Sequence, residues 1–440
     1  MGRLRARLAT LSIGLAVVVS MGSASTVWGF SGFGTSTADA QYGGEMTFRV
    51  ELPGGAPDRL ELLLTFPGSE ETFVAPVVPS GSTATYVWDT STRHVTPNTL
   101  ITYRWRATDG GAVSISPVHD LLYDDDRPGL DWHSAQVGDT TVHWYGGAES
   151  QARRFGELSA GGAQRAEQLL GHQLDGPIDI FVYDSRDDFF GALGPGAREW
   201  TGAATYPELR TIFMWLGGGP DAYLATTIVH EVTHVVFRDA TANPFHEPAK
   251  WLNEGFSTWS EQQSASAERS TVGFEAAGGG LFAFPAIAQQ FPIGTRGSSL
   301  SYAMGAVMVD MIIADHGRDA IARMATAYRD GASDDEAIRA GTGLGADELY
   351  AAFYEAFGVS VPSPVEPAPL PPSNVNLPGG AAAPGGGTSA SAPPAPTGAG
   401  GGGASYWIDI GLLVMVGALI LAGLAAAWRV MRRVGERDLE

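Results

Sequence analysis

The chain has 440 residues and a formal net charge of −21 at pH 7, which argues against nucleic acid and against an anionic membrane surface as partners of its folded part. Hydrophobic residues make up 44% of the chain, enough for a sizeable core, and its length allows about two or three domains. The sequence contains no cysteine, so disulfides, thiolate metal ligands and cysteine nucleophiles are excluded.

Residues 1–24 have the pattern of a secretory signal peptide. Arginines precede a short apolar run from Leu8 to Val19, and Gly22-Ser23-Ala24 offers small residues for cleavage. Ala38-Asp39-Ala40 is a second, more distant candidate cleavage site. Because the apolar run is short for a membrane span, we expect a cleaved signal rather than an anchor.

Residues 41–122 are expected to form a β-rich module. Four segments have the residue types of strands, and Pro, Gly, Ser and Asn clusters separate them: 46–50, 60–64, 84–88 and 100–107. Alternation is clearest in the last, where Ile101, Tyr103 and Trp105 share one face. This spacing favours a β-sandwich of immunoglobulin or fibronectin type III character, acting as a spacer or a recognition module. The acidic run Asp124–Asp126 that follows is interpreted as a solvated loop.

Residues 123–220 carry mixed structure. A hairpin is predicted from Trp132 to Tyr145, and a helical pattern over residues 149–171 is interrupted by Gly161-Gly162. Residues 178–183 and 211–216 are apolar runs typical of strands. The second run lies directly before the segment that carries the chemistry.

That segment is a helix predicted to start near Pro220, with Asp221 as its cap. His230 and His234 are four residues apart, so both imidazoles lie on one face and can reach a single metal ion. Glu231 can face the open side of the metal, and Glu254, on a second helix, can supply the third ligand. Three protein ligands and one open position are the arrangement of a catalytic zinc. The alternative is a buried amphipathic helix whose two histidines are satisfied by other groups.

His230-Glu231-x-x-His234 together with Asn253-Glu254-Gly255-Phe256 resembles the gluzincin metallopeptidases, and the layout of residues 128–358 is similar to the bacterial peptidase MA-like domains. The resemblance implies an α+β fold with a mainly helical C-terminal half, one zinc ion held by His230, His234 and Glu254, and Glu231 as general base. It also implies an oxyanion donor on a later helix. Tyr302 is the candidate, although a tyrosine that only packs on the core is an equal alternative.

The resemblance also predicts where the substrate lies and where this chain differs. In gluzincins the strand before the zinc helix edges the cleft, which here suggests that an extended peptide pairs with residues 209–216. The thermolysin-like group has an aspartate four residues after its ligand glutamate, whereas this chain has Thr258 there. The Gly-x-Met-Glu-Asn stretch of the aminopeptidases is absent from residues 201–215, which favours an endopeptidase or a narrow processing enzyme.

The C-terminal part is predicted to tether the protein. Residues 359–406 are rich in Pro, Gly, Ala and Ser, as in a flexible linker, and 410–428 form an apolar run long enough for one membrane span. Arg429, Arg432 and Arg433 then place the tail, 429–440, in the cytoplasm and the preceding domains outside the cell.

These observations predict a single-pass, cell-surface zinc metallopeptidase that hydrolyses peptide bonds in a peptide or protein substrate. The competing interpretation is a non-catalytic or zinc-stabilised surface module for binding or adhesion. The sequence gives no indication of the oligomeric state.

Overall fold

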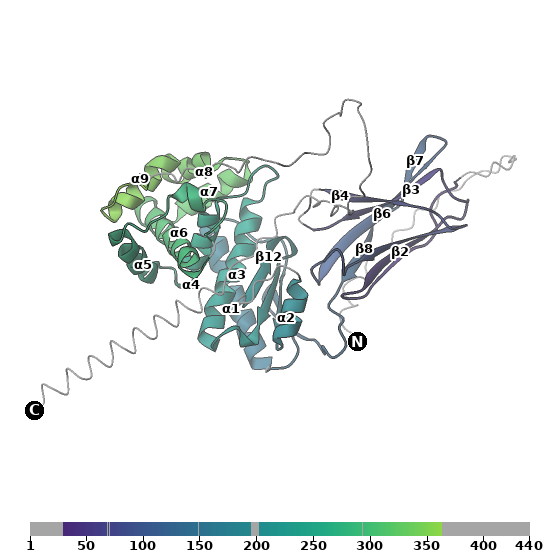
Figure 1. Cartoon of the computed structure of the whole chain (residues 1–440), viewed down its shortest axis with the longest axis horizontal. Helices are drawn as coiled ribbons and strands as arrows, with labels where there is room; N and C mark the ends of the chain where they lie inside the picture. Colours follow the sequence, from purple (N-terminus) through teal and green to yellow (C-terminus); the bar gives the residue numbers. More distant parts are fainter. Residues whose placement is uncertain are drawn as a thin grey trace, which may run out of the picture.

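The structure is a computed structural model that describes residues 30–362, apart from 68, 70, 148, 195–201 and 293. The predicted signal peptide at 1–24, the membrane span at 410–428 and the tail at 429–440 lie outside the described residues, as does the linker from 363 onward. The described chain is α+β: a β-sheet region comes first, a sheet covered by helices follows, and a helical part comes last (Figure 1).

The first part consists of two sheets that share one core. One sheet has the order β1-β2-β5, and the other has the order β4-β3-β6-β7 with β8 also paired to β6. Inward-facing residues of both sheets, such as Phe48, Leu62 and Trp105, are fully buried in a single cluster. The strands span Ser36–Ala40 (β1), Glu45–Glu51 (β2), Arg59–Thr65 (β3), Thr72–Val77 (β4), Thr83–Asp89 (β5), Thr99–Asp109 (β6), Ala112–Ile115 (β7) and His119–Tyr123 (β8).

The β-rich region begins earlier than the expected residue 41. Strand β1 pairs with β2 along its whole length, from Ser36 opposite Val50 to Ala40 opposite Met46. The candidate cleavage site Ala38-Asp39-Ala40 therefore lies within a paired strand. Strands β4, β7 and β8 were also not predicted. Pro76 obscures β4, and a proline is tolerated there because β4 is an outer strand of its sheet.

The junction after β8 is not the solvated loop expected from Asp124–Asp126. Asp125 is 1% exposed and accepts two hydrogen bonds from Arg127, at 2.7 and 2.6 Å. The hydroxyl of Tyr183 donates to the same carboxylate at 2.9 Å, and Arg127 also donates to Asp188 at 3.2 Å. The expectation is wrong for Asp125. The composition of a segment does not show whether a charged residue in it is buried with partners from elsewhere in the chain.

The second sheet, order β12-β13-β11-β10-β9, supports the helix with the two histidines. Strands β10, β11 and β13 are parallel, and the hairpin expected from Trp132 to Tyr145 forms as β9 and β10. Strand β13 pairs on both sides, with β11 and with β12, so residues 209–216 do not provide the free edge that was predicted. The outer strand is β12. The bounds are His133–Val137 (β9), Thr140–Trp144 (β10), Ile178–Tyr183 (β11), Ala203–Tyr206 (β12) and Thr211–Trp215 (β13).

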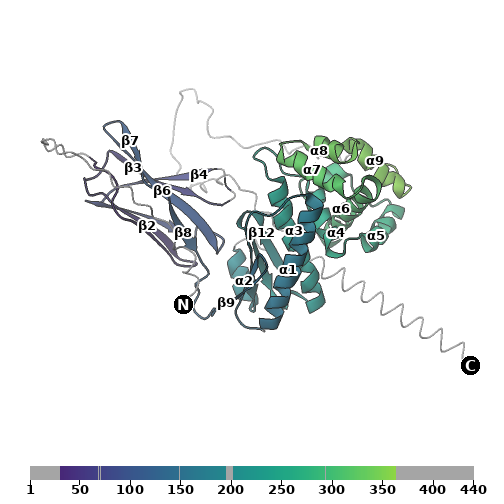
Figure 2. The same cartoon turned by 180° about the vertical axis from the view of Figure 1, so that it is seen from behind.

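Helix α1, Glu149–Leu170, runs alongside α3, Asp221–Thr241, as both views of the molecule show (Figure 2). The glycine pair does not interrupt α1, contrary to the prediction. A side chain at Gly162 would come within 2.8 Å of Val232 Cγ1, so this glycine lets α1 approach α3 closely. Asp221 is the first residue of α3, and Pro220 occupies the cap position.

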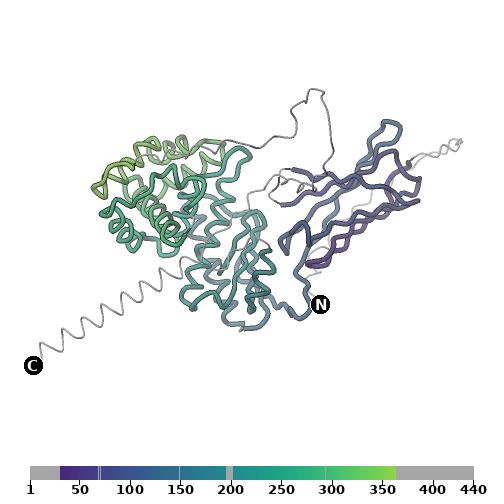
Figure 3. The backbone as a smooth tube through the Cα atoms, in the orientation of Figure 1, coloured from purple at the N-terminus to yellow at the C-terminus, as the bar shows by residue number. Residues whose placement is uncertain are grey.

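The helical part packs around α4 and α6, whose backbones touch at two glycines. A Cβ at Gly255 would lie 2.3 Å from the carbonyl carbon of Gly305, and one at Gly305 would lie 2.4 Å from the carbonyl oxygen of Trp251. The path of the chain through this part is clearest in the tube drawing (Figure 3). The helices span Arg186–Leu193 (α2), Lys250–Gln262 (α4), Ser266–Ala277 (α5), Thr295–His316 (α6), Asp319–Arg329 (α7), Asp334–Thr342 (α8) and Ala346–Ala356 (α9).

Within the described part of the chain, α6 is the one helix long and apolar enough to cross a membrane by length and composition. It is a core helix, because 67% of its apolar window is buried and it packs on α4, α5 and α7. It is also distinct from the span predicted at 410–428.

Candidate metal centre

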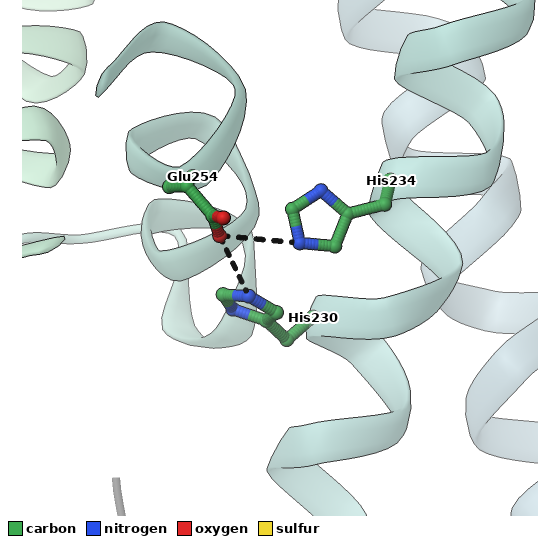
Figure 4. Close-up of side chains that lie close together, drawn as sticks. All are labelled: His230, His234 and Glu254. Carbon is green, nitrogen blue, oxygen red and sulfur yellow. Dashed lines mark ion pairs between the residues drawn. The ribbon is translucent and has the colours of Figure 1, made fainter. Parts of the chain in front are cut away.

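Three ligand-type side chains meet between α3 and α4 (Figure 4). His230 and His234 are one turn apart on α3 and project from the same face toward α4. Glu254 comes from the first half of α4 and points between the two imidazoles. The close contact of α4 with α6 at Gly255, the next residue, fixes the depth at which this carboxylate sits.

The ligand atoms have the separations of a zinc site. Glu254 Oε2 lies 3.6 Å from His230 Nε2 and 3.4 Å from His234 Nε2, and the three ligand atoms are all within 4.8 Å of one another. Tetrahedral zinc with bonds of about 2.0–2.1 Å places its ligands roughly 3.3 Å apart. The side chains of His230, His234 and Glu254 are 0%, 1% and 2% exposed. Bulk water therefore cannot serve as the partner of their ligand atoms.

That partner is missing within the protein. His230 Nε2, His234 Nε2 and Glu254 Oε2 are buried and make no hydrogen bond. Unpaired buried polar atoms are costly, and three of them facing one another are unfavourable without a shared partner. A metal ion bound by all three removes the cost, so these residues fit the ion that the sequence implies.

The opposite nitrogens of the imidazoles are held by the protein. His230 Nδ1 lies 2.9 Å from Glu261 Oε1, and His234 Nδ1 lies 2.8 Å from Asn253 Oδ1 and 3.1 Å from Ser257 Oγ. Hydrogen bonds to acceptors at Nδ1 place the proton there and leave Nε2 free as a metal ligand. Thr258, at the position where the thermolysin-like group has an aspartate, makes no hydrogen bond through its buried hydroxyl. The carboxylate that contacts His230 Nδ1 in this chain is Glu261.

Opposing charges set the protonation of the ligands in the metal-free protein. Burial alone would lower the pKa of His230, but the nearby carboxylates of Glu254 and Glu261 raise it to about 10. For Glu254, burial alone would raise the pKa, but Lys250 and His234 hold it well below its usual range. Lys250 Nζ contacts the second oxygen of this carboxylate, Oε1, at 3.1 Å.

Glu231 is buried beside the three ligand residues and is oriented by the sheet. Thr205 in β12 donates its hydroxyl proton to Glu231 Oε2 at 2.5 Å, while Oε1 is buried without a hydrogen bond. Burial raises the pKa of the Glu231 carboxyl, and His230 and His234 partly offset this. A carboxylate with one oxygen anchored, one oxygen free and a raised pKa is suited to accepting a proton.

Tyr302 lies next to the centre, with its ring centroid 6.1 Å from that of His230. It is 5% exposed and packs edge-on against Phe291. Helix α6 starts at Thr295, so Tyr302 lies well inside the helix. His246 lies elsewhere, with Nε2 3.1 Å from Asp334.

Sequence reasoning did not find the residues that surround the ligands. Glu261 follows Glu254 by two helical turns and Lys250 precedes it by one, so a search along the face of α4 would have found both. Asn253 was recognised only as part of the motif around Glu254, and its contact with His234 was not predicted. Thr205 carries no sequence signal, because it meets Glu231 only through the pairing of β12 with β13.

Comparison with known proteins gives a family match for part of the chain. The model of the Peptidase MA superfamily matches residues 160–356, which contain all the residues of the centre. This match and the His–His–Glu cluster support a zinc-dependent peptidase in general terms. No curated protein sequence matches the chain.

The solved structures that resemble the chain include an M1 zinc metallopeptidase from Deinococcus radiodurans, at 12% identity and a TM-score of 0.33, covering 74% of this chain and 91% of the other. A mutant two-domain M1 zinc metallopeptidase bound to L-arginine has 12% identity, a TM-score of 0.34 and the same coverage. A likeness of this size does not establish a shared overall fold.

Proposed function

We propose that this protein is a zinc-dependent peptidase whose centre consists of His230, His234, Glu254 and Glu231. The observation that carries the proposal is the set of buried, unpartnered atoms at one place: two histidine Nε2 atoms and one carboxylate oxygen, with the free oxygen of Glu231 nearby. A structural zinc site is closed by four protein ligands, whereas three ligands beside a free carboxylate match a hydrolytic centre.

The residues have separate roles. His230, His234 and Glu254 hold the ion, and Glu261, Asn253 and Ser257 keep the two imidazoles in the tautomer that binds it. Zinc, when bound, supplies a Lewis acid that polarises a carbonyl and a water of lowered pKa.

Proton transfer falls to Glu231. Its free Oε1 accepts the proton of the attacking water and passes it to the leaving amine, while Thr205 keeps Oε2 in place. Tyr302 is the candidate donor to the developing oxyanion, since its ring lies beside His230.

The substrate would lie along β12. Among the described strands of its sheet, β12 pairs on one side only, with β13, and it carries the Thr205 contact to Glu231. An extended peptide that adds to this strand would place its backbone beside the centre. This moves the predicted pairing site from residues 209–216 to 203–206.

The location follows from the sequence pattern. A signal peptide at 1–24, a span at 410–428 and arginines after it would make a single-pass protein displayed outside the cell. The two-sheet region, which we infer to be an immunoglobulin-like or fibronectin-like sandwich, would stand beside the peptidase domain.

The test compares the full-length chain, purified in mild detergent, with Glu231→Gln and with Glu149→Gln as a control on the exposed part of α1. We would measure bound zinc and cleavage of an unfolded protein mixture. Near-stoichiometric zinc in all three, with cleavage lost only in Glu231→Gln, supports the proposal. Zinc in all with cleavage in none favours a binding module instead. Absence of zinc from the wild-type protein overturns the proposal.

A further inference from the structure

Lys250 is the only lysine in the 440-residue sequence; the remaining basic residues of the 27 are all arginine. It occupies the first position of α4, one turn before Glu254. Its ammonium lies 3.1 Å from Glu254 Oε1, and the two side chains are 15% and 2% exposed. The ammonium group of this lysine therefore contacts the carboxylate that supplies the third ligand of the candidate metal centre.

Contacts around Lys250 fix its position. Its backbone N–H donates to the carbonyl of Ala288 at 2.6 Å, which ties the start of α4 to the segment before α6. Its ammonium lies 5.3 Å from the ring centroid of Phe291, within the range of a cation–π contact. Phe291 in turn packs on Tyr302, so the lysine belongs to the wall of the centre.

The two oxygens of Glu254 are divided between two partners. Oε1 faces Lys250, whereas Oε2 faces the two imidazoles and has no hydrogen bond. An ammonium is a compact charge that can bind one oxygen and leave the other free. A guanidinium presents a planar fork that engages both oxygens of a carboxylate. An arginine here would therefore compete for the oxygen that the metal needs.

We propose that Lys250 is a positioning residue that holds Glu254 Oε1 and so keeps Glu254 a ligand through Oε2 alone. The inference rests on the proposed zinc centre and adds to it a residue that determines how the third ligand binds. Without Lys250, Oε1 would be a buried, unpaired oxygen free to turn toward the ion. Glu254 would then bind with both oxygens and occupy space that the open position requires.

The experiment uses the full-length chain with Lys250→Met, Lys250→Gln and Lys250→Arg. Arg153→Met is the matched control, because it removes a cation from an exposed pair of the same spacing, Arg153 with Glu149 on α1. Zinc affinity is measured by competition with a chromophoric chelator, and the number of oxygen ligands by X-ray absorption. Circular dichroism of the metal-free proteins confirms folding, and if Lys250→Met does not fold, Lys250→Gln and Lys250→Arg decide.

We expect Lys250→Met to bind zinc about 10- to 100-fold more weakly, as is typical when a partner of a metal ligand is lost. Its zinc should gain one oxygen neighbour. Lys250→Arg should not restore the affinity, whereas Lys250→Gln, which can still donate to Oε1, should fall between Lys250→Met and the wild type. Arg153→Met should match the wild type.

The results separate this inference from the proposed function. If the wild-type protein binds zinc and Lys250→Met binds it equally well with unchanged ligand number, the role of Lys250 is refuted and the peptidase proposal stands. Wild-type affinity in Lys250→Arg would also refute it, because charge alone would then suffice. If the wild-type protein binds no zinc, both the role of Lys250 and the peptidase proposal are refuted.

Discussion

At the scale of single residues, the candidate centre depends as much on the neighbours of the ligands as on the ligands. His230, His234, Glu231 and Glu254 were predicted from the sequence because a metal site on a helix requires fixed spacing. Glu261 and Thr205 were not, since one lies two turns along α4 and the other on a strand. The structure shows that these neighbours decide which nitrogen and which oxygen remain free.

Replacement of Glu261 by alanine is expected to weaken zinc binding about 10- to 100-fold, because His230 would lose the acceptor that fixes its tautomer. Zinc competition titration measures the change. Glu157→Ala, on the exposed side of α1, is the control and should leave the affinity unchanged. Equal affinities in the two variants would show that Glu261 does not orient the ligand.

Zinc binding is expected to strengthen with rising pH. In the metal-free protein the pKa of His230 is raised to about 10, so the residue is protonated at pH 7, and zinc must displace that proton. Below this pKa each displaced proton makes the apparent association constant rise about tenfold per pH unit. Chelator competition at several pH values between about 6 and 8, corrected for the chelator, measures the slope. A flat profile would contradict a protonated His230.

At the scale of secondary structure elements, close helix contacts explain several differences from the sequence prediction. The glycine pair in α1 was expected to break the helix, but Gly162 lies where α1 crosses α3. Gly255 was recognised only as part of the metal motif, yet it is also where α4 meets α6. A single sequence does not distinguish a glycine that allows close helix packing from one that ends a helix. The difference depends on which residues of other helices lie next to it, and these are known only from the structure.

Gly305→Ala is expected to lower the free energy of unfolding by about 1–3 kcal/mol, because the new methyl group would overlap the carbonyl oxygen of Trp251, which α4 holds in place. This is the net change, because the overlap costs more than the roughly 1 kcal/mol that alanine gains over glycine within a helix. Chemical denaturation measures both variants of the matched pair. In the control, Gly273→Ala in α5, the added carbon would have its nearest neighbour at 4.0 Å and should stabilise the protein slightly. Stabilisation by both substitutions would disprove the tight contact.

At the scale of the whole molecule, the β-sheet region is joined to the α+β part by polar contacts as well as by the chain. Tyr42, which follows β1, donates its hydroxyl proton to the carbonyl of Gly191 in α2 at 2.6 Å. Arg127 stacks on its ring at 4.6 Å and binds both Asp125 and Asp188. The sequence predicted the two parts separately, but their junction joins residues far apart in the chain and could not be inferred from local patterns.

Arg127→Met is expected to destabilise the protein by about 3 kcal/mol, because it leaves the 1% exposed carboxylate of Asp125 without its cation. Calorimetry should show a lower unfolding temperature. The control is Arg49→Met, which breaks an ion pair with side chains 53% and 78% exposed and should cost at most about 1 kcal/mol. If the two variants unfold at the same temperature, the junction does not depend on Arg127.

Strand β1 has a further consequence for the protein as it exists in solution. In the order β1-β2-β5, it covers one side of β2, whose Met46, Phe48 and Val50 belong to the core. Removal of Ser36–Ala40 by a protease would uncover a row of backbone donors and acceptors beside those apolar residues. Such an edge can pair with the same edge of another copy. We therefore expect a preparation trimmed after Ala40 to self-associate more than the intact chain, which sedimentation would measure.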